Sequence, residues 1–358
     1  MTYVIAAAGT GGHVYPALAV ARALTDRGVS RDEILFLGGN RLAATAVPAA
    51  GFNFLGFELT RLHRNLSPQN LKIPVILRRT SAAMADEIRK FGGRVVLGMS
   101  GYVTVPAAMA ARRAGIPFVL QEQNAHPGIA ARFASRRAVT TFLGLSGRAA
   151  ALPRSVLVGN PLSRQIADFD RRALRREARA RYGIVVPAPV VGIVGGSLGA
   201  RVLNEAAARI VEGSPKIGSV VHLTGPDAFD DMSRRAAQSS LPWICLPSES
   251  QMEYFYAAVD LVVCRSGAMT VSELAATGTP SLLVPLARVG QSWNAESLSA
   301  IGGAEIVAEG DVGSLPARIT ALLTDEHGLA AMSRAARSAA FTDSAGVIAD
   351  RLREVASA

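Results

Sequence analysis

The chain has 358 residues, of which 49% are hydrophobic, so it is long enough for two hydrophobic cores and we expect two folded domains. Its net charge of +10 comes from the first half, because residues 1–160 hold 19 Lys and Arg against 7 Asp and Glu, whereas residues 161–358 hold 19 against 21. Such a basic half suits an anionic membrane surface, and we expect no nucleic-acid partner, because aromatic residues are only 6% and no zinc-finger or RNA-binding signature is present. No stretch is typical of a membrane span or a secretory signal, so we expect the chain to stay inside the cell.

Ten apolar segments alternate with helical patterns along the chain. They are YVIAAA (3–8), EILFLGG (33–39), RVVLGMS (94–100), PFVLQEQ (117–123), TTFLGL (140–145), PVVGIVGGS (189–197), SVVHLTG (219–225), WICLPS (243–248), DLVVCRSG (260–267) and PSLLVPL (280–286). Uniformly apolar strands with helices between them indicate an α/β protein with parallel sheets covered on both faces. A Pro-containing turn and an Arg-rich helix separate the two series, which places the boundary near Pro161. We therefore predict domains 1–160 and 161–342, with an amphipathic helix over about 343–358 packing back onto the first.

Each half opens with the same local pattern. GTGGHVYPALAVARAL (9–24) follows the first strand, and GGSLGARVLNEAAARI (195–210) follows the first strand of the second series. A glycine-rich turn between strand and helix brings backbone N–H groups close to an anionic or hydroxylic ligand. We predict two Rossmann-like domains whose glycine turns face each other across a cleft. Asp32 and Glu33 precede the second strand instead of ending it, which disfavours NAD.

His13 lies in the first turn of the first of these helices. The helix dipole opposes a charged imidazole there, which favours a neutral ring able to accept a proton. His13 is therefore a candidate general base, with a hydrogen-bonded cap residue as the alternative. The five histidines share no ligand spacing, so we expect no metal site.

The segment CRSGAMTVSELAATGTPSLLVP (264–285) predicts a nucleotide-binding turn. Arg265 ends a strand, and the helix from Ala268 offers backbone amides together with Thr270, which suits a diphosphate. Glu273, one turn further on, suits a ribose diol, although it also fits a helix N-terminal turn. Gln291 and Asn294 begin a later helix, where their amides suit sugar hydroxyls.

Asp168 and Asp170 form a D-x-D pattern of the kind that holds a metal in many sugar-nucleotide enzymes. Because the pair precedes the Arg-rich helix, we interpret it as structural, with Asp170 as the N-cap.

Taken as an ordered set, the motifs resemble those of the MurG family nearly end to end. They are GTGGHVYPALAVA, GYVTVPAAMAA, QEQNAHPG, VGNP, GGSLGARVLN, DLVVCRSGAMTVSE and QSWNA. The resemblance implies a peripheral membrane transferase that moves N-acetylglucosamine from UDP-N-acetylglucosamine to the undecaprenyl-diphosphate-linked muramyl pentapeptide (lipid I), giving lipid II on the cytoplasmic face. It also implies an inverting, metal-independent enzyme of the GT-B fold without a cofactor, with the acceptor in the first domain and the donor in the second.

The resemblance further implies a role for individual residues. His13 is the preferred general base and Glu122 the second candidate. The acceptor site would comprise Thr10, Gly11, Gly12, Tyr102 and Asn124. The donor site would comprise Arg164, Ser197, Arg265, Ala268, Met269, Thr270, Glu273, Gln291 and Asn294.

Three positions depart from the family pattern. Gly290 replaces a side chain before the sugar-reading segment, Ser163 takes the place expected for Arg164, and Ala43 stands where the family has Glu. These changes leave open a diverged transferase with another UDP-sugar or acceptor. A nucleotide-sugar-binding membrane protein without turnover and a UDP-sugar 2-epimerase also stay open.

The segment NLKIPVILRRTSAAMA (70–85) is a candidate membrane contact. It combines apolar and cationic side chains, namely Ile73, Val75, Ile76 and Leu77 with Lys72, Arg78 and Arg79, and Arg136 and Arg137 are expected nearby. An apolar patch rimmed by cations rests well on anionic lipid. A buried helix with a solvated basic flank is the equal alternative.

Overall fold

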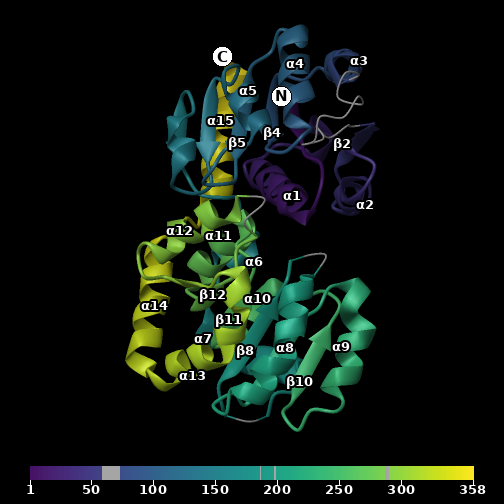
Figure 1. Cartoon of the computed structure of the whole chain (residues 1–358). Coiled ribbons are helices and arrows are strands. Elements are labelled where there is room, and N and C mark those ends of the chain that lie inside the picture. Colours follow the sequence, from purple (N-terminus) through teal and green to yellow (C-terminus); the bar gives the residue numbers. More distant parts are fainter. Residues whose placement is uncertain (59–72, 186, 197–198, 287–289) are drawn as a thin grey trace. The chain divides into compact units, whose positions relative to one another are not determined.

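The computed structural model describes residues 1–58, 73–185, 187–196, 199–286 and 290–358 (Figure 1). These residues form two compact units. The first comprises Met1–Ser163 and Thr342–Ala358, and the second comprises Arg164–Phe341. The division between Ser163 and Arg164 lies close to the expected boundary at Pro161.

The first unit is built on a sheet of seven parallel strands in the order β3-β2-β1-β4-β5-β6-β7. The strands are β1 (Tyr3–Ala6), β2 (Ile34–Gly39), β3 (Asn53–Phe57), β4 (Val95–Met99), β5 (Phe118–Glu122), β6 (Thr140–Leu143) and β7 (Ser155–Leu157). Tyr3 of β1 is paired with Ile34 of β2 on one side and with Val95 of β4 on the other. The strand order reverses at β1 and β4, and ligands of open α/β sheets bind at such a switch point.

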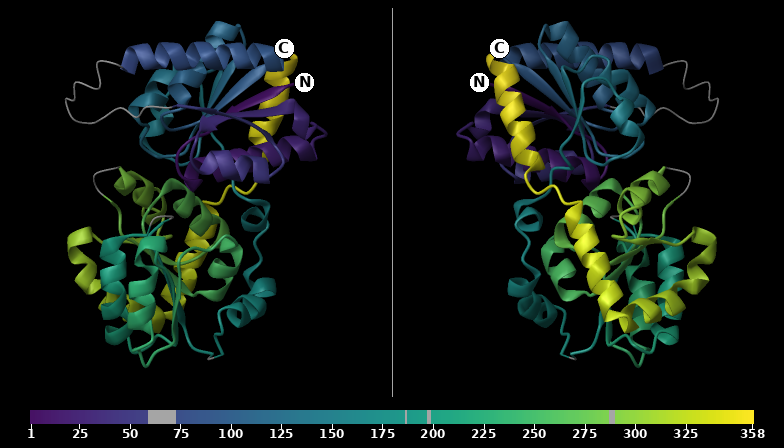
Figure 2. Two further views of the ribbon diagram at one scale, coloured as in Figure 1. Left: turned by 90° about the vertical axis from the view of Figure 1, so that its right-hand side faces the viewer. Right: turned by 90° about the vertical axis from the view of Figure 1, so that its left-hand side faces the viewer.

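Helices cover both faces of this sheet (Figure 2). They are α1 (Gly11–Asp26), α2 (Leu42–Ala49), α3 (Ile73–Phe91), α4 (Thr104–Ala114), α5 (Ile129–Ser135) and α15 (Ser344–Ser357), with short 3-10 turns η1 (Arg31–Glu33) and η3 (Arg148–Ala151). Side chains alternate along β1, so that Tyr3 and Ile5 join the core under α1, α2 and α15, whereas Val4 and Ala6 join the core under α3, α4 and α5.

The C-terminal helix α15 packs against α1 in the first unit. Ile348 and Leu352 are buried in the same core as α1, at 0% and 1% exposure. The Arg27 guanidinium pairs with the Asp350 carboxylate at 2.6 Å, and Ser344 Oγ donates to the Val158 carbonyl at 2.7 Å. Residues 342–358 therefore complete a core that is otherwise built from residues 1–163.

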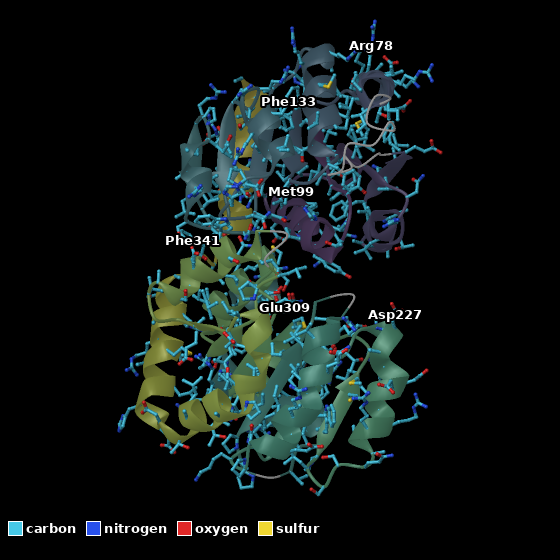
Figure 3. The ribbon with its side chains drawn as sticks, in the orientation of Figure 1. Arg78, Met99, Phe133, Asp227, Glu309 and Phe341 are labelled. Atoms are coloured by element: carbon cyan, nitrogen blue, oxygen red, sulfur yellow. The ribbon has the colours of Figure 1, made fainter. Side chains whose placement is uncertain are left out.

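The helix α3 only partly matches the expected membrane patch. Ile73 is in the core at 7% exposure, whereas Val75 is 54% exposed. Arg78 and Arg79 are exposed, and Figure 3 shows Arg78 at the outer edge of the first unit. The expectation was therefore wrong for Ile73, because α3 must bury one side against the sheet. Lys72 lies outside the described residues.

The second unit repeats the design with six parallel strands in the order β10-β9-β8-β11-β12-β13. The strands are β8 (Val190–Val194), β9 (Ser219–Leu223), β10 (Trp243–Leu246), β11 (Leu261–Cys264), β12 (Ser281–Leu283) and β13 (Glu305–Ile306). The helices are α6 (Arg164–Ala167), α7 (Arg171–Arg181), α8 (Arg201–Gly213), α9 (Phe229–Ala236), α10 (Met252–Ala258), α11 (Ala268–Thr277), α12 (Gln291–Ser299), α13 (Leu315–Thr324) and α14 (Glu326–Ser338), with 3-10 turns η4 (Pro226–Ala228) and η6 (Glu309–Ser314). The order reverses at β8 and β11, which makes the β11–α11 turn a second switch point.

The predicted fold class is confirmed, since two parallel sheets with helices on their faces form two Rossmann-like units. Asp170 is the N-cap of α7 as predicted, because its Oδ1 accepts from the backbone N–H groups of Arg172 and Ala173 at 2.9 and 3.1 Å. None of the helices within the described ranges combines the length and the apolar character needed to cross a bilayer.

Candidate active site

Two glycine-containing turns hold His13 at the switch point of the first unit. Gly9, with φ +117°, leads from β1 into α1, and Gly101, with φ +74°, follows the neighbouring strand β4. A methyl group added at Gly101 would lie 3.2 Å from His13 Nε2, so the absence of a side chain lets the ring approach the backbone. A methyl group at Gly9 would lie 3.7 Å from both His13 Nδ1 and Tyr102 Cε1. The structure thus brings together His13, Tyr102 and the turn that contains Thr10, Gly11 and Gly12.

Glu122 ends β5 and is 1% exposed. Its Oε1 accepts from the Asn124 backbone N–H at 2.8 Å and from Asn124 Nδ2 at 3.1 Å, and its Oε2 accepts from Ser100 Oγ at 3.1 Å. Burial raises the pKa of the Glu122 carboxyl, and these hydrogen bonds oppose that rise. Glu122 therefore orients Asn124 and ties the loop after β5 to the turn after β4.

In the second unit, Arg265 directly follows β11 and precedes the start of α11. Its Nη1 donates to the Val284 carbonyl at 3.0 Å, and its Nη2 donates to Glu309 Oε1 at 2.5 Å. Glu309, labelled in Figure 3, opens η6. Two partners from different elements therefore fix the guanidinium beside the first turn of α11, where Gly267 is the N-cap and Ala268, Met269 and Thr270 follow.

Glu273 lies one turn further along α11 and is half-buried. The Tyr256 hydroxyl, from α10, donates to Glu273 Oε2 at 2.8 Å. Burial raises the pKa of the Glu273 carboxyl to about 7, and the hydrogen bond from Tyr256 opposes that rise. This carboxyl consequently changes charge near neutral pH.

The two amides at the start of α12 already have protein partners. Asn294 is 1% exposed, and its Nδ2 donates to the Ser266 carbonyl at 3.2 Å. Gln291 Oε1 accepts from the Leu286 N–H at 3.0 Å, and the Gln291 carbonyl accepts from Ser266 Oγ at 2.9 Å. Both residues thus bind α12 to the β11–α11 turn, and of the two only Gln291 keeps partial exposure.

Two donor-site candidates remain, namely Ser197 and Arg164. Ser197 lies outside the described residues. Arg164 opens α6 with a side chain that is 81% exposed and pairs with Asp168 at 3.4 Å. In the second glycine turn, a methyl group on Gly199 would come within 2.2 Å of the Thr224 carbonyl oxygen, so only glycine fits there.

Two of the departures from the family pattern have a local physical reason. Gly290 is the N-cap of α12 with φ +76°, a left-handed conformation that favours glycine. Ala43 is 1% exposed and lies in the apolar core of the first unit, where an ionised carboxylate would be costly to bury.

The sequence reasoning missed three residues that organise these turns. They are Ser100, Tyr256 and Ser266. Ser100 and Ser266 each follow a buried strand closely, and this position was the available signal. Tyr256 lies in the apolar segment MEYFYAA, where a tyrosine has the pattern of a core residue.

Two Rossmann-like units, each with a glycine-rich turn at its switch point, form the architecture of GT-B glycosyltransferases. Residues 3–143 match the glycosyltransferase family 28 N-terminal domain, and residues 190–348 match the glycosyltransferase family 28 C-terminal domain.

Relatives match over the full length. A UDP-N-acetylglucosamine–N-acetylmuramyl-(pentapeptide) pyrophosphoryl-undecaprenol N-acetylglucosamine transferase of Acidothermus cellulolyticus is 36% identical and covers 100% of this chain and 99% of its own. A transferase of the same name from Mycolicibacterium smegmatis is 37% identical over 100% of this chain and 95% of its own. The crystal structure of Acinetobacter baumannii MurG is 25% identical, covers 99% of this chain and 100% of its own, and superposes with a TM-score of 0.76. The chain therefore belongs to glycosyltransferase family 28 and, within it, to the MurG transferases.

A UDP-GlcNAc 2-epimerase from Neisseria meningitidis has a TM-score of 0.68 at 12% identity over 99% of this chain and 100% of its own. At that identity the likeness concerns the fold alone.

Proposed function

We propose that this protein transfers N-acetylglucosamine from UDP-N-acetylglucosamine to the muramyl sugar of lipid I and so makes lipid II. The observation that carries the proposal is the identity of 36% with transferases of that name over the whole chain. The arrangement of side chains at the two switch points supports it, since one suits an alcohol and the other suits a nucleoside diphosphate.

The acceptor hydroxyl binds at the first switch point, with His13 as its general base. The His13 ring is half-buried between two glycine turns, next to Tyr102, so a small ligand can approach it. Glu122 is a weaker candidate, because it is 1% exposed and three hydrogen bonds from Asn124 and Ser100 already engage both of its oxygens. Glu122 instead orients Asn124 toward the acceptor.

The donor binds at the β11–α11 turn. The diphosphate lies against Arg265 and the backbone N–H groups at the start of α11, where the helix dipole favours an anion. Glu273 accepts hydrogen bonds from the ribose hydroxyls, and Gln291 contacts the sugar. Asn294 supports this site from behind through Ser266, because its side chain is buried.

The reaction is a direct displacement with inversion. The acceptor oxygen forms a bond to the anomeric carbon while the bond from that carbon to the UDP oxygen breaks, and His13 takes the hydroxyl proton. Proton transfer to a positioned base contributes a factor of about 10²–10⁴. Arg265 and the helix amides stabilise the charge that develops on the leaving diphosphate, without a metal ion.

The protein works while resting on the cytoplasmic face of the membrane. Three features of the first unit support an anionic lipid surface as partner. They are the exposed Val75 beside Arg78 and Arg79, the excess of basic residues in the first half, and a cavity of about 550 Å³ whose lining includes His126, Arg132, Arg136 and Arg148. Sedimentation with vesicles of neutral or anionic lipid tests this, and Arg78→Glu with Arg79→Glu is expected to abolish the preference for anionic vesicles.

The deciding experiment supplies the purified protein with a lipid I analogue and a panel of UDP-sugars, and identifies the products by mass spectrometry. We expect UDP and a β-linked disaccharide lipid with UDP-N-acetylglucosamine alone. The His13→Ala variant is expected to lose turnover, and His327→Ala, at an exposed histidine of α14, serves as the matched control.

Three different results would each point to another activity. A product with a different sugar would indicate a diverged transferase. This is the specific competing hypothesis, because Gly290 replaces a side chain near the donor site. Donor binding without turnover would indicate a non-catalytic binding protein, and an epimerised UDP-sugar formed without acceptor would indicate an epimerase.

A further inference from the structure

Tyr256, which is buried, and Glu273, which is half-buried, form a hydrogen-bonded pair at the proposed donor site. Tyr256 is 1% exposed, and its hydroxyl donates to Glu273 Oε2 at 2.8 Å. We propose that Tyr256 is a positioning residue, which fixes the Glu273 carboxylate so that it accepts both hydroxyls of the donor ribose. The inference rests on the proposed function, because it assumes that Glu273 meets the ribose.

The Glu273 carboxylate can accept hydrogen bonds from the protein and from a ligand at the same time. An ionised carboxylate offers about four lone-pair sites on its two oxygens. Among the described residues, only Oε2 accepts a protein hydrogen bond, and that bond comes from Tyr256. Oε1 and the second lone pair of Oε2 are then available for two adjacent hydroxyls. One fixed contact on Oε2 sets the plane of the carboxylate, which a diol needs for paired hydrogen bonds.

The same contact favours the ionised form of Glu273. Burial raises the pKa of the Glu273 carboxyl to about 7, and the hydrogen bond from Tyr256 lowers it from a still higher value. Burial also raises the pKa of the Tyr256 hydroxyl well above 10, so the phenol remains a donor throughout the physiological range. Cys264 on β11 interacts with Glu273, and its own raised pKa keeps the thiol neutral.

Several charged or titratable residues lie on the helices around α11. The helices α6, α12 and α14 pack against α11. They carry Arg164, Glu296, Glu326, His327, Arg334 and Arg337, and α10, which contains Tyr256, also carries Glu253. Arg337 Nη1 donates to the Ala276 carbonyl of α11 at 3.0 Å. The pKa of Glu273 is nevertheless set by burial and by Tyr256.

Packing alone does not require this hydroxyl. Tyr256 lies beside Phe255, whose ring is fully buried at an edge-on angle of 76° to it. A phenylalanine would fill the same space and would avoid the cost of burying a polar group. The oxygen therefore serves Glu273, and the Tyr256→Phe variant removes that contact while keeping the ring.

The test measures the dissociation constants of UDP and of 2′-deoxy-UDP by calorimetry between pH 6 and pH 9. The proteins are the wild type, Tyr256→Phe, Glu273→Gln and the control Tyr254→Phe. Tyr254 lies on the same helix, and its hydroxyl donates to a different carboxylate, Glu177, at 2.8 Å. Its loss removes an equivalent hydrogen bond away from Glu273.

We expect the wild type to prefer UDP, with an affinity that falls as the pH drops below 7 and Glu273 becomes protonated. Tyr256→Phe should raise the dissociation constant of UDP at pH 7 by about tenfold, which is the effect of one charge-assisted hydrogen bond. The dissociation constant of 2′-deoxy-UDP should change less. Because the pKa of Glu273 rises without the phenol, the loss should shrink toward pH 9. Tyr254→Phe should match the wild type.

Three results would overturn the inference. They are an unchanged UDP affinity and pH profile in Tyr256→Phe, an equal loss for both ligands at every pH, and an unchanged UDP affinity in Glu273→Gln. The last result would leave the proposed reaction standing with another ribose contact. A folded wild type that binds no UDP would overturn the proposed function together with this inference.

Discussion

Leu352 tests how strongly α15 supports the first unit. Its side chain is 1% exposed in the core that α15 shares with α1. Leu352→Ala removes three carbons, which at about 0.8 kcal/mol for each buried methylene group costs roughly 2.5 kcal/mol of unfolding free energy. The cavity that remains adds to this cost and brings the total to about 2.5–5 kcal/mol. In a domain of this size each kcal/mol lowers the melting temperature by about 2–4 °C, so we expect a fall of roughly 5–20 °C.

The two tryptophans allow the units to be followed separately. Trp243 and Trp293 both lie in the second unit, whereas circular dichroism reports helices of both. We expect Leu352→Ala to lower the melting temperature of the first unit. The shift should appear in circular dichroism and not in tryptophan fluorescence. The matched control is Val347→Ala on the same helix, where 42% exposure predicts a change within about 0.5 kcal/mol. Equal effects of the two variants, or a shift confined to the fluorescence, would refute the reasoning.

Three further predictions concern the two switch points and the start of α12. His13→Ala should lower turnover by about 10²–10⁴-fold with unchanged UDP affinity by calorimetry, because His13 acts on the acceptor, and equal losses of both would make it a scaffold residue. Arg265→Lys should raise the dissociation constant of UDP about tenfold and leave that of uridine unchanged, because only the diphosphate uses the guanidinium fork; parallel losses would contradict this. Gly290→Ala should destabilise the second unit by about 1 kcal/mol in fluorescence-detected unfolding, because alanine is strained at φ +76°, whereas Gly310→Ala, with open space around it, should not.

The sequence contained most of the fold because the central strands are uniformly apolar. All ten expected segments form strands, and their order along the chain predicted two parallel sheets. The missed strands β3, β7 and β13 lie at sheet edges. β3 contains only exposed and half-buried residues, and β7 and β13 contain three and two residues. Such short, partly solvated segments lack the apolar run that marks a buried strand.

The positions of the candidate site residues could be predicted from the sequence, but their side-chain contacts could not. Polar residues after strands marked both turns, and the structure brings His13 and Tyr102 together at the first of them. The sequence could not indicate that Asn294 would turn inward to Ser266, because the orientation of a side chain on a helix start depends on neighbours that are distant in sequence. The hydrogen bond between Tyr256 and Glu273 likewise depends on how α10 and α11 pack together, which the sequence does not indicate.

The placement of α15 makes the first unit a discontinuous one. During synthesis residues 1–163 emerge first, and the whole second unit follows before the ribosome adds residues 342–358. Until then the apolar side of α1 lacks its cover, so the nascent first unit exposes surface that a chaperone or a neighbouring chain can bind. Because α15 is made after the whole second unit, it sets the moment at which the first unit becomes fully folded.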